Sequence, residues 1–315
     1  MFFLHALAAS ASLMATLSSA LPAKRQTSDG KLVVYWGAED DSTTLDDVCS
    51  DPSYDIVNLA FLDTFFAAGG YPQMSISGLW SSTQAQKNAG ATGLKDGSSI
   101  VPAIQKCQAA GKPVLLSLGG YNADVTLAND DQGRQIANTL WNLFLGGTQN
   151  RSLRPFGDLK LDGFDLDNES HNPTGYLVMV QQMRANFQND TSKRYLLTAA
   201  PQCPYPDASM PLNVCREMDY VWVQFYNNGN CNVAQPGFLN AVRKWSSGIG
   251  NAKLFIGALA SGADGDQGYV DANTLENSLR SVQSLNLPNY GGAMLWEAQL
   301  AVQNGNYQKK IATAV

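Results

Sequence analysis

Eight short apolar runs punctuate the chain, and they limit its fold more than any other feature of the sequence. Each run is long enough for one buried strand, and most are followed by a segment with the apolar spacing of a helix. This alternation of strand and helix is typical of parallel α/β folds. The runs cover residues 31–37, 54–62, 112–120, 161–169, 195–200, 220–226, 253–260 and 291–296.

The count of eight predicts a single (β/α)8 TIM barrel, in which catalytic groups lie at the carboxyl ends of the strands. A doubly wound sheet has the same alternation but places its ligand at one switch point. Here polar or aromatic residues close nearly every run, which favours the barrel. Helices are expected at residues 100–110, 134–145, 173–186, 238–247 and 274–285.

The fourth run carries an unusual set of acids, Asp165, Asp167 and Glu169. Alternate side chains of a strand share one face, so these three acids are expected to line one face, with Phe164 and Leu166 on the other. Neighbouring acids would then be about 6–7 Å apart along the backbone. Three negative charges so close in a partly buried site predict that at least one carboxyl keeps its proton near neutral pH.

A protonated carboxyl beside an ionised one is the arrangement that cleaves glycosidic bonds. The alternatives are an exposed acidic edge or a calcium site. The apolar residues between the acids argue against an exposed edge, and a calcium loop would need a turn and more oxygen ligands. Glycoside hydrolysis is therefore the favoured chemistry.

Four motifs resemble glycoside hydrolase family 18, the retaining chitinases. Residues 162–169 match the DGxDxDxE signature of that family at every acidic position. Residues 117–120, 199–203 and 224–228 are similar to its hevamine-like class III branch. The likeness extends from about residue 33 to residue 296, nearly the whole chain after its amino-terminal segment.

The resemblance implies a role for each acid. Glu169 is the expected proton donor, Asp167 the group that stabilises the acetamido nitrogen of the substrate, and Asp165 a deeper partner that can share a proton with Asp167. The attacking nucleophile would be the substrate's own N-acetyl carbonyl, giving an oxazolinium intermediate. Tyr226 carries over as the hydroxyl that orients the acetamido oxygen, although a buried core tyrosine would look the same in sequence.

Five further residues are expected to contact the substrate. Trp296 resembles the apolar floor beneath the distorted sugar, unless it is a plain core tryptophan. The others also fall at the ends of the apolar runs, where they could equally be layers of the barrel: Tyr35, Phe61, Gln202 and Asn227. The resemblance also implies cis peptide bonds at 60–61 and 296–297.

Other chemistries find little support in the sequence. After the amino-terminal segment the chain holds one histidine, His171, so neither a zinc site with several histidines nor a Ser-His-Asp device is expected. The glycines between 257 and 268 lack the spacing of a phosphate-binding loop, so no nucleotide cofactor is expected. No metal is predicted either.

The amino-terminal residues 1–20 read as a secretory signal peptide, with a membrane anchor as the alternative. Residues 21–25 end in the dibasic pair Lys24-Arg25 and are expected to be removed, which leaves residues 26–315 as the catalytic domain. Removal would change the formal net charge from −6 to −8, because two basic residues and no acidic ones are lost. An acidic, secreted monomer suits neither nucleic acid nor a membrane, and chitin oligosaccharides are the expected partner.

Five cysteines in a secreted chain predict disulfides and one leftover thiol, but their spacing leaves the pairing open. The resemblance implies the pairs Cys49–Cys107 and Cys203–Cys231. Three sequons are present, at Asn150, Asn168 and Asn189. Asn168 lies within the acid-bearing run, where a glycan would disturb packing, so only Asn150 and Asn189 are expected to be glycosylated.

The chain departs from its relatives where the first run ends. Hevamine-like enzymes usually continue Tyr-Trp-Gly with Gln-Asn, whereas here Gly37 is followed by Ala38 and then Glu39. A substrate-contacting amide is thus missing. The favoured function is a secreted endochitinase. A chitin-binding lectin, a glycosidase inhibitor of the same fold, or an endo-N-acetylglucosaminidase acting on N-glycan cores are the alternatives.

Overall fold

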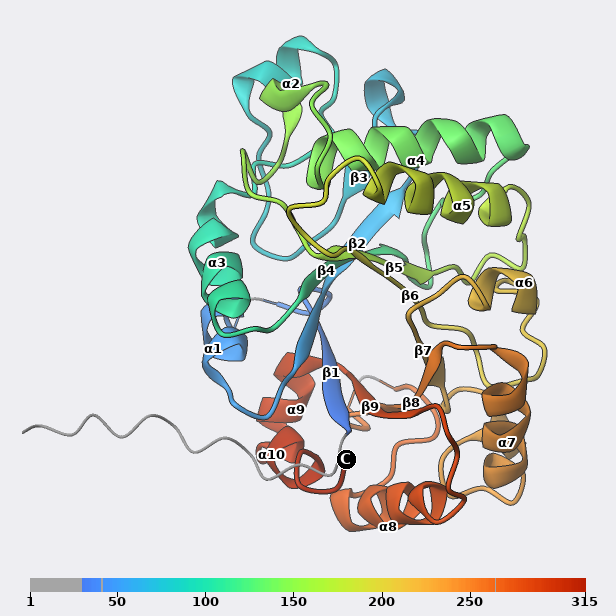
Figure 1. The fold of residues 1–315 in the computed structure, drawn as a ribbon. Coiled ribbons are helices and arrows are strands. Elements are labelled where there is room, and N and C mark those ends of the chain that lie inside the picture. Colours follow the sequence, from blue (N-terminus) through green and yellow to red (C-terminus); the bar gives the residue numbers. More distant parts are fainter. Residues whose placement is uncertain (1–29, 41, 264) are drawn as a thin grey trace, which may run out of the picture.

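The strands of the computed structural model form a ring of eight parallel strands, and the prediction of a (β/α)8 barrel is confirmed (Figure 1). The structure describes residues 30–40, 42–263 and 265–315. The expected signal peptide and processing segment therefore lie outside the described residues. The eight barrel strands are β1 (Lys31–Trp36), β2 (Ile56–Thr64), β4 (Val114–Gly119), β5 (Gly163–Asp167), β6 (Leu196–Ala199), β7 (Tyr220–Gln224), β8 (Lys253–Leu259) and β9 (Tyr290–Trp296).

The ring closes at its first strand. β1 pairs in parallel with β2 on one side and with β9 on the other, so within the described residues no barrel strand is left with an open edge. Closure places the carboxyl ends of all eight strands around one mouth.

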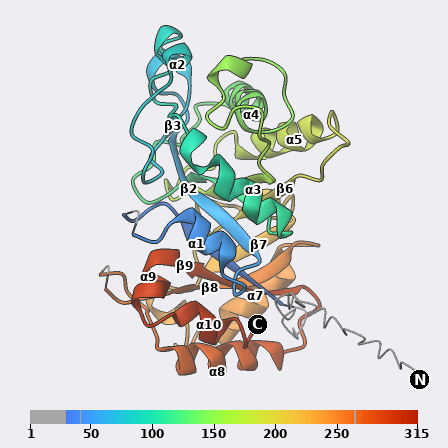
Figure 2. The same ribbon diagram turned by 90° about the vertical axis from the view of Figure 1, so that its left-hand side faces the viewer.

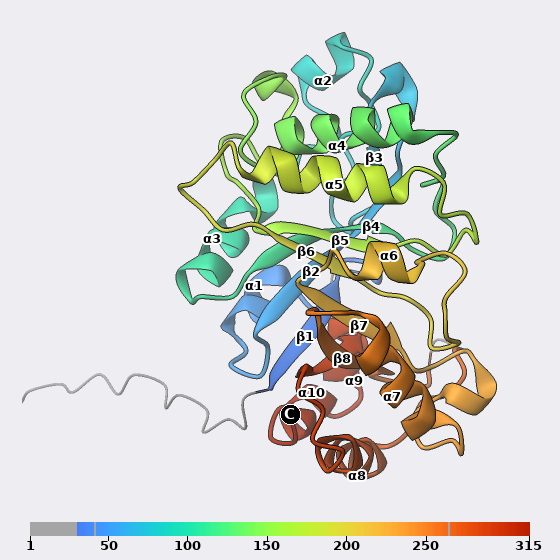
Figure 3. The same ribbon diagram turned by 45° about the vertical axis from the view of Figure 1, so that its right-hand side comes forward.

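Helices surround the ring, as Figure 3 shows for α4 and α5, which lie side by side over β4, β5 and β6. All five predicted helices are present, with ends shifted by a few residues. The helices are α1 (Leu45–Ser50), α2 (Gln84–Asn88), α3 (Val101–Ala109), α4 (Asp130–Phe144), α5 (Tyr176–Phe187), α6 (Leu212–Cys215), α7 (Phe238–Gly248), α8 (Ala272–Gln283), α9 (Ala298–Gln303) and α10 (Tyr307–Ile311). None of the described helices is long and apolar enough to cross a membrane.

Among the five predicted helices, α4 begins farthest from its predicted start, and the cause is local. The prediction began the helix at residue 134, where its apolar spacing starts. Asn129 caps the helix by accepting a hydrogen bond from the Gln132 amide, and Asp130 and Asp131 then occupy the first turn. Acidic side chains are favourable there because they face the positive end of the helix dipole.

One excursion from the barrel was not predicted. The two-residue strand β3 (Gln73–Met74) pairs antiparallel with β2, and the chain then continues into α2 (Figure 2). β2 extends to Thr64, two residues beyond its predicted end, because it has this extra partner.

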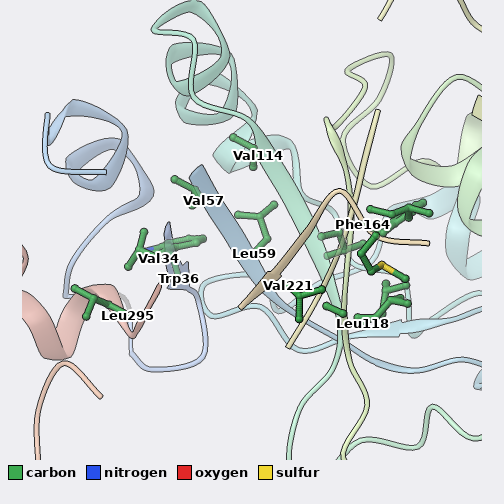
Figure 4. Close-up of a cluster of buried hydrophobic side chains, with 14 of the residues drawn as sticks. Val34, Trp36, Val57, Leu59, Val114, Leu118, Phe164, Val221 and Leu295 are labelled. Atoms are coloured by element: carbon green, nitrogen blue, oxygen red, sulfur yellow. The ribbon is translucent and has the colours of Figure 1, made fainter. Parts of the chain in front are cut away.

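The strands bury their two faces in two separate clusters. Val33 and Tyr35 of β1 pack inside the ring with residues such as Trp222 and Met294. Alternate residues face outward and pack beneath the helices, and Figure 4 shows Val34, Trp36, Val57, Leu59, Val114, Leu118, Phe164, Val221 and Leu295 of this outer layer. Because both faces are apolar, a charged side chain inside the ring stands out.

Candidate active site

β5 carries the acids, and it divides them between the inside and the mouth of the barrel. Asp165 is fully buried inside the ring, and Asp167 is 4% exposed at the end of the strand. Phe164 and Leu166 face outward in the helix-covered layer, as the alternation of the sequence predicted. β5 ends at Asp167, so Glu169 lies two residues beyond the strand rather than within it.

The neighbouring strand β4 approaches β5 closely at this point. Gly119 is paired with Asp167 and has a φ of +132°. A Cβ atom added at Gly119 would lie 1.9 Å from the Asp167 carbonyl oxygen, so only glycine fits there. Gly119 at the end of β4 therefore lets the two backbones approach closely and sets the position of the Asp167 backbone.

Three hydroxyl groups hold Asp165. Tyr35 and Ser117 each donate a 2.7 Å hydrogen bond to its Oδ2, and Thr198 donates one of 2.7 Å to its Oδ1. Burial raises the pKa of the Asp165 carboxyl, and these hydrogen bonds oppose the rise. Proton sharing with Asp167 stays a prediction; in this arrangement both Asp165 oxygens already accept hydrogen bonds.

Asp167 has a strongly perturbed carboxyl. Burial is the largest cause that raises its pKa, followed by the charges of Glu169 and Asp165. Gln224 donates a 2.9 Å hydrogen bond from Nε2 to its Oδ1, which favours the ionised form. The same Nε2 also donates to the Ala200 carbonyl at 3.0 Å, so the amide is firmly oriented.

Glu169 lies at the mouth of the barrel, where the amide of Gln202 holds its carboxyl. Gln202 donates from Nε2 to Glu169 Oε2 at 3.1 Å, and Gln202 Oε1 in turn accepts a hydrogen bond from Asn228 Nδ2. Burial raises the pKa of the Glu169 carboxyl above its ordinary value. A carboxyl of this kind can hold a proton at a pH where an exposed glutamate would have lost it.

The acids open into a cavity of about 420 Å³ at the mouth of the barrel. Seven of the nine residues predicted for catalysis and substrate contact line it: Phe61, Asp167, Glu169, Gln202, Tyr226, Asn227 and Trp296. The other two, Asp165 and Tyr35, lie beneath it. Tyr35 was predicted to line the cleft, but it is 1% exposed and instead supports Asp165.

Aromatic rings form one wall of the cavity. The rings of Phe61 and Trp296 are stacked, with centroids 5.7 Å apart and planes 23° apart. Phe61 lies inside β2 rather than at its end, because β2 continues to Thr64. Both predicted cis peptide bonds, Ala60–Phe61 and Trp296–Glu297, are present. A flat apolar wall of this kind suits the face of a sugar ring.

Tyr226 and Asn227 follow β7 and also line the cavity. Tyr226 is 5% exposed, and burial followed by the charge of Asp167 raises the pKa of its phenol, so it stays protonated. Asn227 donates from Nδ2 to Asp266 at 2.9 Å and accepts from the Gln267 amide at 2.7 Å. It therefore also anchors the loop after β8.

Four residues of the site were missed. Gln224 begins the 224–228 motif, and as the inward-facing polar residue that ends β7 it could have been found from the alternation of that strand. Tyr121 and Asp266 line the cavity from loops, where the sequence has no periodic signal. Asp207 lies in the loop after β6, where its charge raises the pKa of Asp167 and Glu169.

Both disulfide pairs implied by the resemblance are present, Cys49–Cys107 and Cys203–Cys231. Cys203–Cys231 joins the loops after β6 and β7, which carry Gln202 and Asn228. Cys215 is a free, buried thiol, and burial raises its pKa to about 12. Within the described residues, no group of three or more His, Cys, Asp or Glu could hold a metal ion.

The three sequons differ sharply in their surroundings. Asn150 and Asn189 are exposed. Asn168 is 2% exposed, and its Nδ2 donates at 3.1 Å to the carbonyl oxygens of both Asn172 and Ser209. Its amide is thus fully used inside the fold, which agrees with the expectation that Asn168 carries no glycan. Glycosylation of Asn150 and Asn189 stays a prediction.

Comparison with known proteins gives a consistent set of relatives. Residues 31–262 match the family described as Glycosyl hydrolases family 18. Endochitinase 3 of Metarhizium robertsii is 66% identical over 302 residues, which is 95% of each chain.

Two solved structures share the fold. The ICChI chitinase of Ipomoea carnea superposes with a TM-score of 0.77 at 30% identity and covers 91% of this chain and 100% of its own. A xylanase and alpha-amylase inhibitor protein, XAIP-I, superposes equally well at 29% identity, covering 90% of this chain and 98% of its own.

Proposed function

Since the chain belongs to glycosyl hydrolase family 18 and is a chitinase, we propose that it cleaves internal β-1,4 bonds between N-acetylglucosamine units with retention of the anomeric configuration. The observation that carries this proposal is the meeting of Glu169, Asp167 and Tyr226 in one cavity. The two carboxyls have raised pKa values, and the phenol is neutral. These are the groups that substrate-assisted hydrolysis requires.

In the first step, protonated Glu169 donates its proton to the glycosidic oxygen as the bond from C1 to that oxygen breaks. The carbonyl oxygen of the substrate's acetamido group attacks C1 and forms a cyclic oxazolinium ion. Asp167 accepts the N–H of that group and stabilises its positive charge. The Tyr226 hydroxyl donates to the acetamido oxygen and keeps it aimed at C1.

In the second step, Glu169 is a carboxylate and takes a proton from water. The water oxygen attacks C1 from the side that the leaving group occupied, and the bond from C1 to the acetamido oxygen breaks. Two inversions at C1 leave the product in its original β configuration, and Glu169 is protonated again. The stacked rings of Phe61 and Trp296 would carry the sugar during both steps.

We further propose that the protein is secreted after removal of residues 1–25 and acts outside the cell as a monomer. Two disulfides support this route, because disulfides persist in oxidising compartments. The exposure of Asn150 and Asn189 fits glycosylation on the same route.

The similarity to an inhibitor protein gives the main alternative, a non-catalytic member of the fold. Such a protein would bind a glycan or a glycosidase without cleaving it. The presence of Glu169, Asp167 and Tyr226 together favours the enzyme, because binding alone does not require carboxyls with raised pKa values. An endo-N-acetylglucosaminidase remains the less favoured enzyme alternative.

The test uses proton NMR to identify the anomeric form of the first product from a soluble N-acetylglucosamine hexamer. The proposal expects β-anomer from the native protein and none from Glu169→Gln, whose amide oxygen can still accept the hydrogen bond of Gln202. Early products of intermediate length would indicate internal cleavage. Initial α-anomer would contradict retention, and binding without cleavage by the native protein would support the lectin or inhibitor.

A further inference from the structure

Asp207 is a buried carboxylate, 9% exposed, in the loop that connects β6 to α6. Its Oδ1 accepts hydrogen bonds from the amides of Ser209 (2.8 Å) and Met210 (2.6 Å). Its Oδ2 accepts one from the amide of Gln202 (3.2 Å). Three backbone donors stabilise the ionised form of Asp207 in a loop that has no regular secondary structure here.

Two of these three donors belong to residues that hold Glu169. Gln202 donates from its side chain to Glu169 Oε2. Ser209 accepts a hydrogen bond from Asn168 Nδ2 at its carbonyl oxygen and one of 2.9 Å from the His171 amide at Oγ. The chain is thus held on both sides of Glu169, and the Glu169 carboxyl is held as well.

The charge of Asp207 also acts on the catalytic pair. It raises the pKa of both Asp167 and Glu169. Burial raises the pKa of Asp207 itself, and the three backbone amides and the nearby His171 oppose that rise. Cys215, a neutral thiol, also lies close to Asp207.

A second cavity of about 340 Å³ joins these groups. Glu169, His171, Gln202 and Asp207 all line it. Glu169 and Gln202 line the catalytic cavity as well, so the two spaces meet at these residues. Asp207 and the proton donor Glu169 therefore line one common cavity.

We infer that Asp207 is a positioning residue for hydrolysis, which fixes Gln202 and Ser209 against Glu169 and places a carboxylate in the cavity that Glu169 also lines. This inference rests on the proposed function, since it needs Glu169 to act as the acid. Asp207 itself does not touch the reacting atoms. Its effect should be seen in the rate and in its pH dependence more than in substrate binding.

The test compares Asp207→Asn with Asp162→Asn. Asparagine at 207 can still accept the amides of Ser209 and Met210 through its carbonyl oxygen, but its amide nitrogen cannot accept the Gln202 amide and it carries no charge. Asp162 is a matched control at the opposite end of β5, where it accepts the Val114 amide at 2.8 Å and pairs with Lys193. Both variants remove an acid that braces the backbone, and only one of them faces Glu169.

For Asp207→Asn we expect the alkaline limb of the kcat profile to shift to lower pH by about half a unit to one unit. The reason is that loss of a neighbouring negative charge lets Glu169 give up its proton more easily. kcat near neutral pH should fall several-fold, with KM changed much less. The limb of Asp162→Asn should stay where the native protein has it. An unmoved limb in Asp207→Asn, with only a loss of stability as in the control, would overturn the inference.

Ser209→Ala covers the case in which Asp207→Asn does not fold. It removes only the acceptor of the His171 amide. Glu169 should then be held less firmly, and kcat should fall about two- to five-fold, which matches the contribution of one hydrogen bond. The alkaline limb of the pH profile should stay where the native protein has it. Native kcat and KM in Ser209→Ala would contradict the positioning role. If the native protein cleaves nothing, the proposed function fails and the inference with it; if it cleaves with retention and the variants behave like the control, only the inference fails.

Discussion

The Tyr35 hydroxyl donates a 2.7 Å hydrogen bond to Asp165 Oδ2, linking β1 to β5 across the interior of the ring. Trp222 of β7 donates from Nε1 to the same hydroxyl at 2.9 Å. Three strands thus meet at one phenol beneath the catalytic cavity. This phenol can serve both neighbours because a hydroxyl donates and accepts at once.

Replacement of Tyr35 by phenylalanine should weaken both the fold and the catalyst. The change removes one donor from Asp165 and leaves Trp222 Nε1 without its acceptor, which should cost about 1–3 kcal/mol of unfolding free energy. We also expect kcat to fall about ten-fold, because the charge state and position of Asp165 influence Asp167. Urea unfolding and hexamer hydrolysis measure the two effects. Native stability and rate in Tyr35→Phe would contradict this role.

The rate should depend on pH through the raised pKa of Glu169. Cleavage needs the protonated acid, so kcat should fall as pH rises through that pKa. Because burial raises the pKa, the fall should come at a higher pH than the value of about 4.3 for an ordinary glutamate. A profile of kcat against pH with the soluble hexamer measures it. Loss of half the rate by pH 4.5 would show that the pKa of Glu169 is not raised in the complex.

Glu297 should make the fold less stable as pH rises. It is 1% exposed, and burial raises its pKa to about 7. Between the unfolded pKa near 4.3 and about 7 the folded state binds more protons than the unfolded state, so the stability that its protonated form contributes is lost through this window. Glu297→Gln keeps the acceptor for the Leu300 amide and cannot ionise.

We therefore expect Glu297→Gln to be more stable than the native protein by about 2 kcal/mol at pH 8 and nearly equal to it at pH 4. Urea unfolding at the two pH values, with disulfides intact, measures the difference. Glu276→Gln is the control, because Glu276 is more exposed and pairs with Arg280 on the same helix. A gain at pH 8 in both variants would mean that net charge, rather than the buried carboxyl, is responsible.

The two disulfides should differ in their effect on catalysis. They span 28 and 58 residues, so loop-closure entropy predicts a similar loss of about 4 kcal/mol when either is removed. Only Cys203–Cys231 joins the loops of Gln202 and Asn228. The double alanine variant of that pair should lose activity at a temperature where both variants are folded, and the Cys49–Cys107 variant should not. Equal activity in the two folded variants would contradict a role for this disulfide in the site.

The barrel could be predicted because each strand is a short apolar run with its own alternation. That period also placed Asp165 and Asp167 inside the ring and Phe164 outside it. The end of β2 could not be predicted, because it depends on pairing with β3, a strand of two residues that carries no pattern of its own. Strand ends were therefore the weaker part of the prediction, and they explain the misplacement of Phe61.

Site residues in loops were harder to predict than those in strands. Asp207 follows no period, and its importance lies in three backbone amides that only the folded loop brings to it. Tyr35 shows a different limit: its position in a strand was predicted, but its depth below the cavity depends on how the ring is filled. A single sequence therefore predicts which face of a strand a side chain occupies more readily than how deeply that side chain is buried.

Closure of the ring through β1 has a consequence for how the chain acquires activity. The cavity takes Phe61 from β2 and Trp296 from the last strand, so its wall exists only after the two ends of the barrel have met. Contacts between such distant segments form slowly, because a long loop must first be closed. A half-assembled barrel would hold its carboxyls without a surface to carry the sugar. The onset of hydrolysis of a soluble oligosaccharide during refolding should therefore report closure of the barrel, the final step of folding.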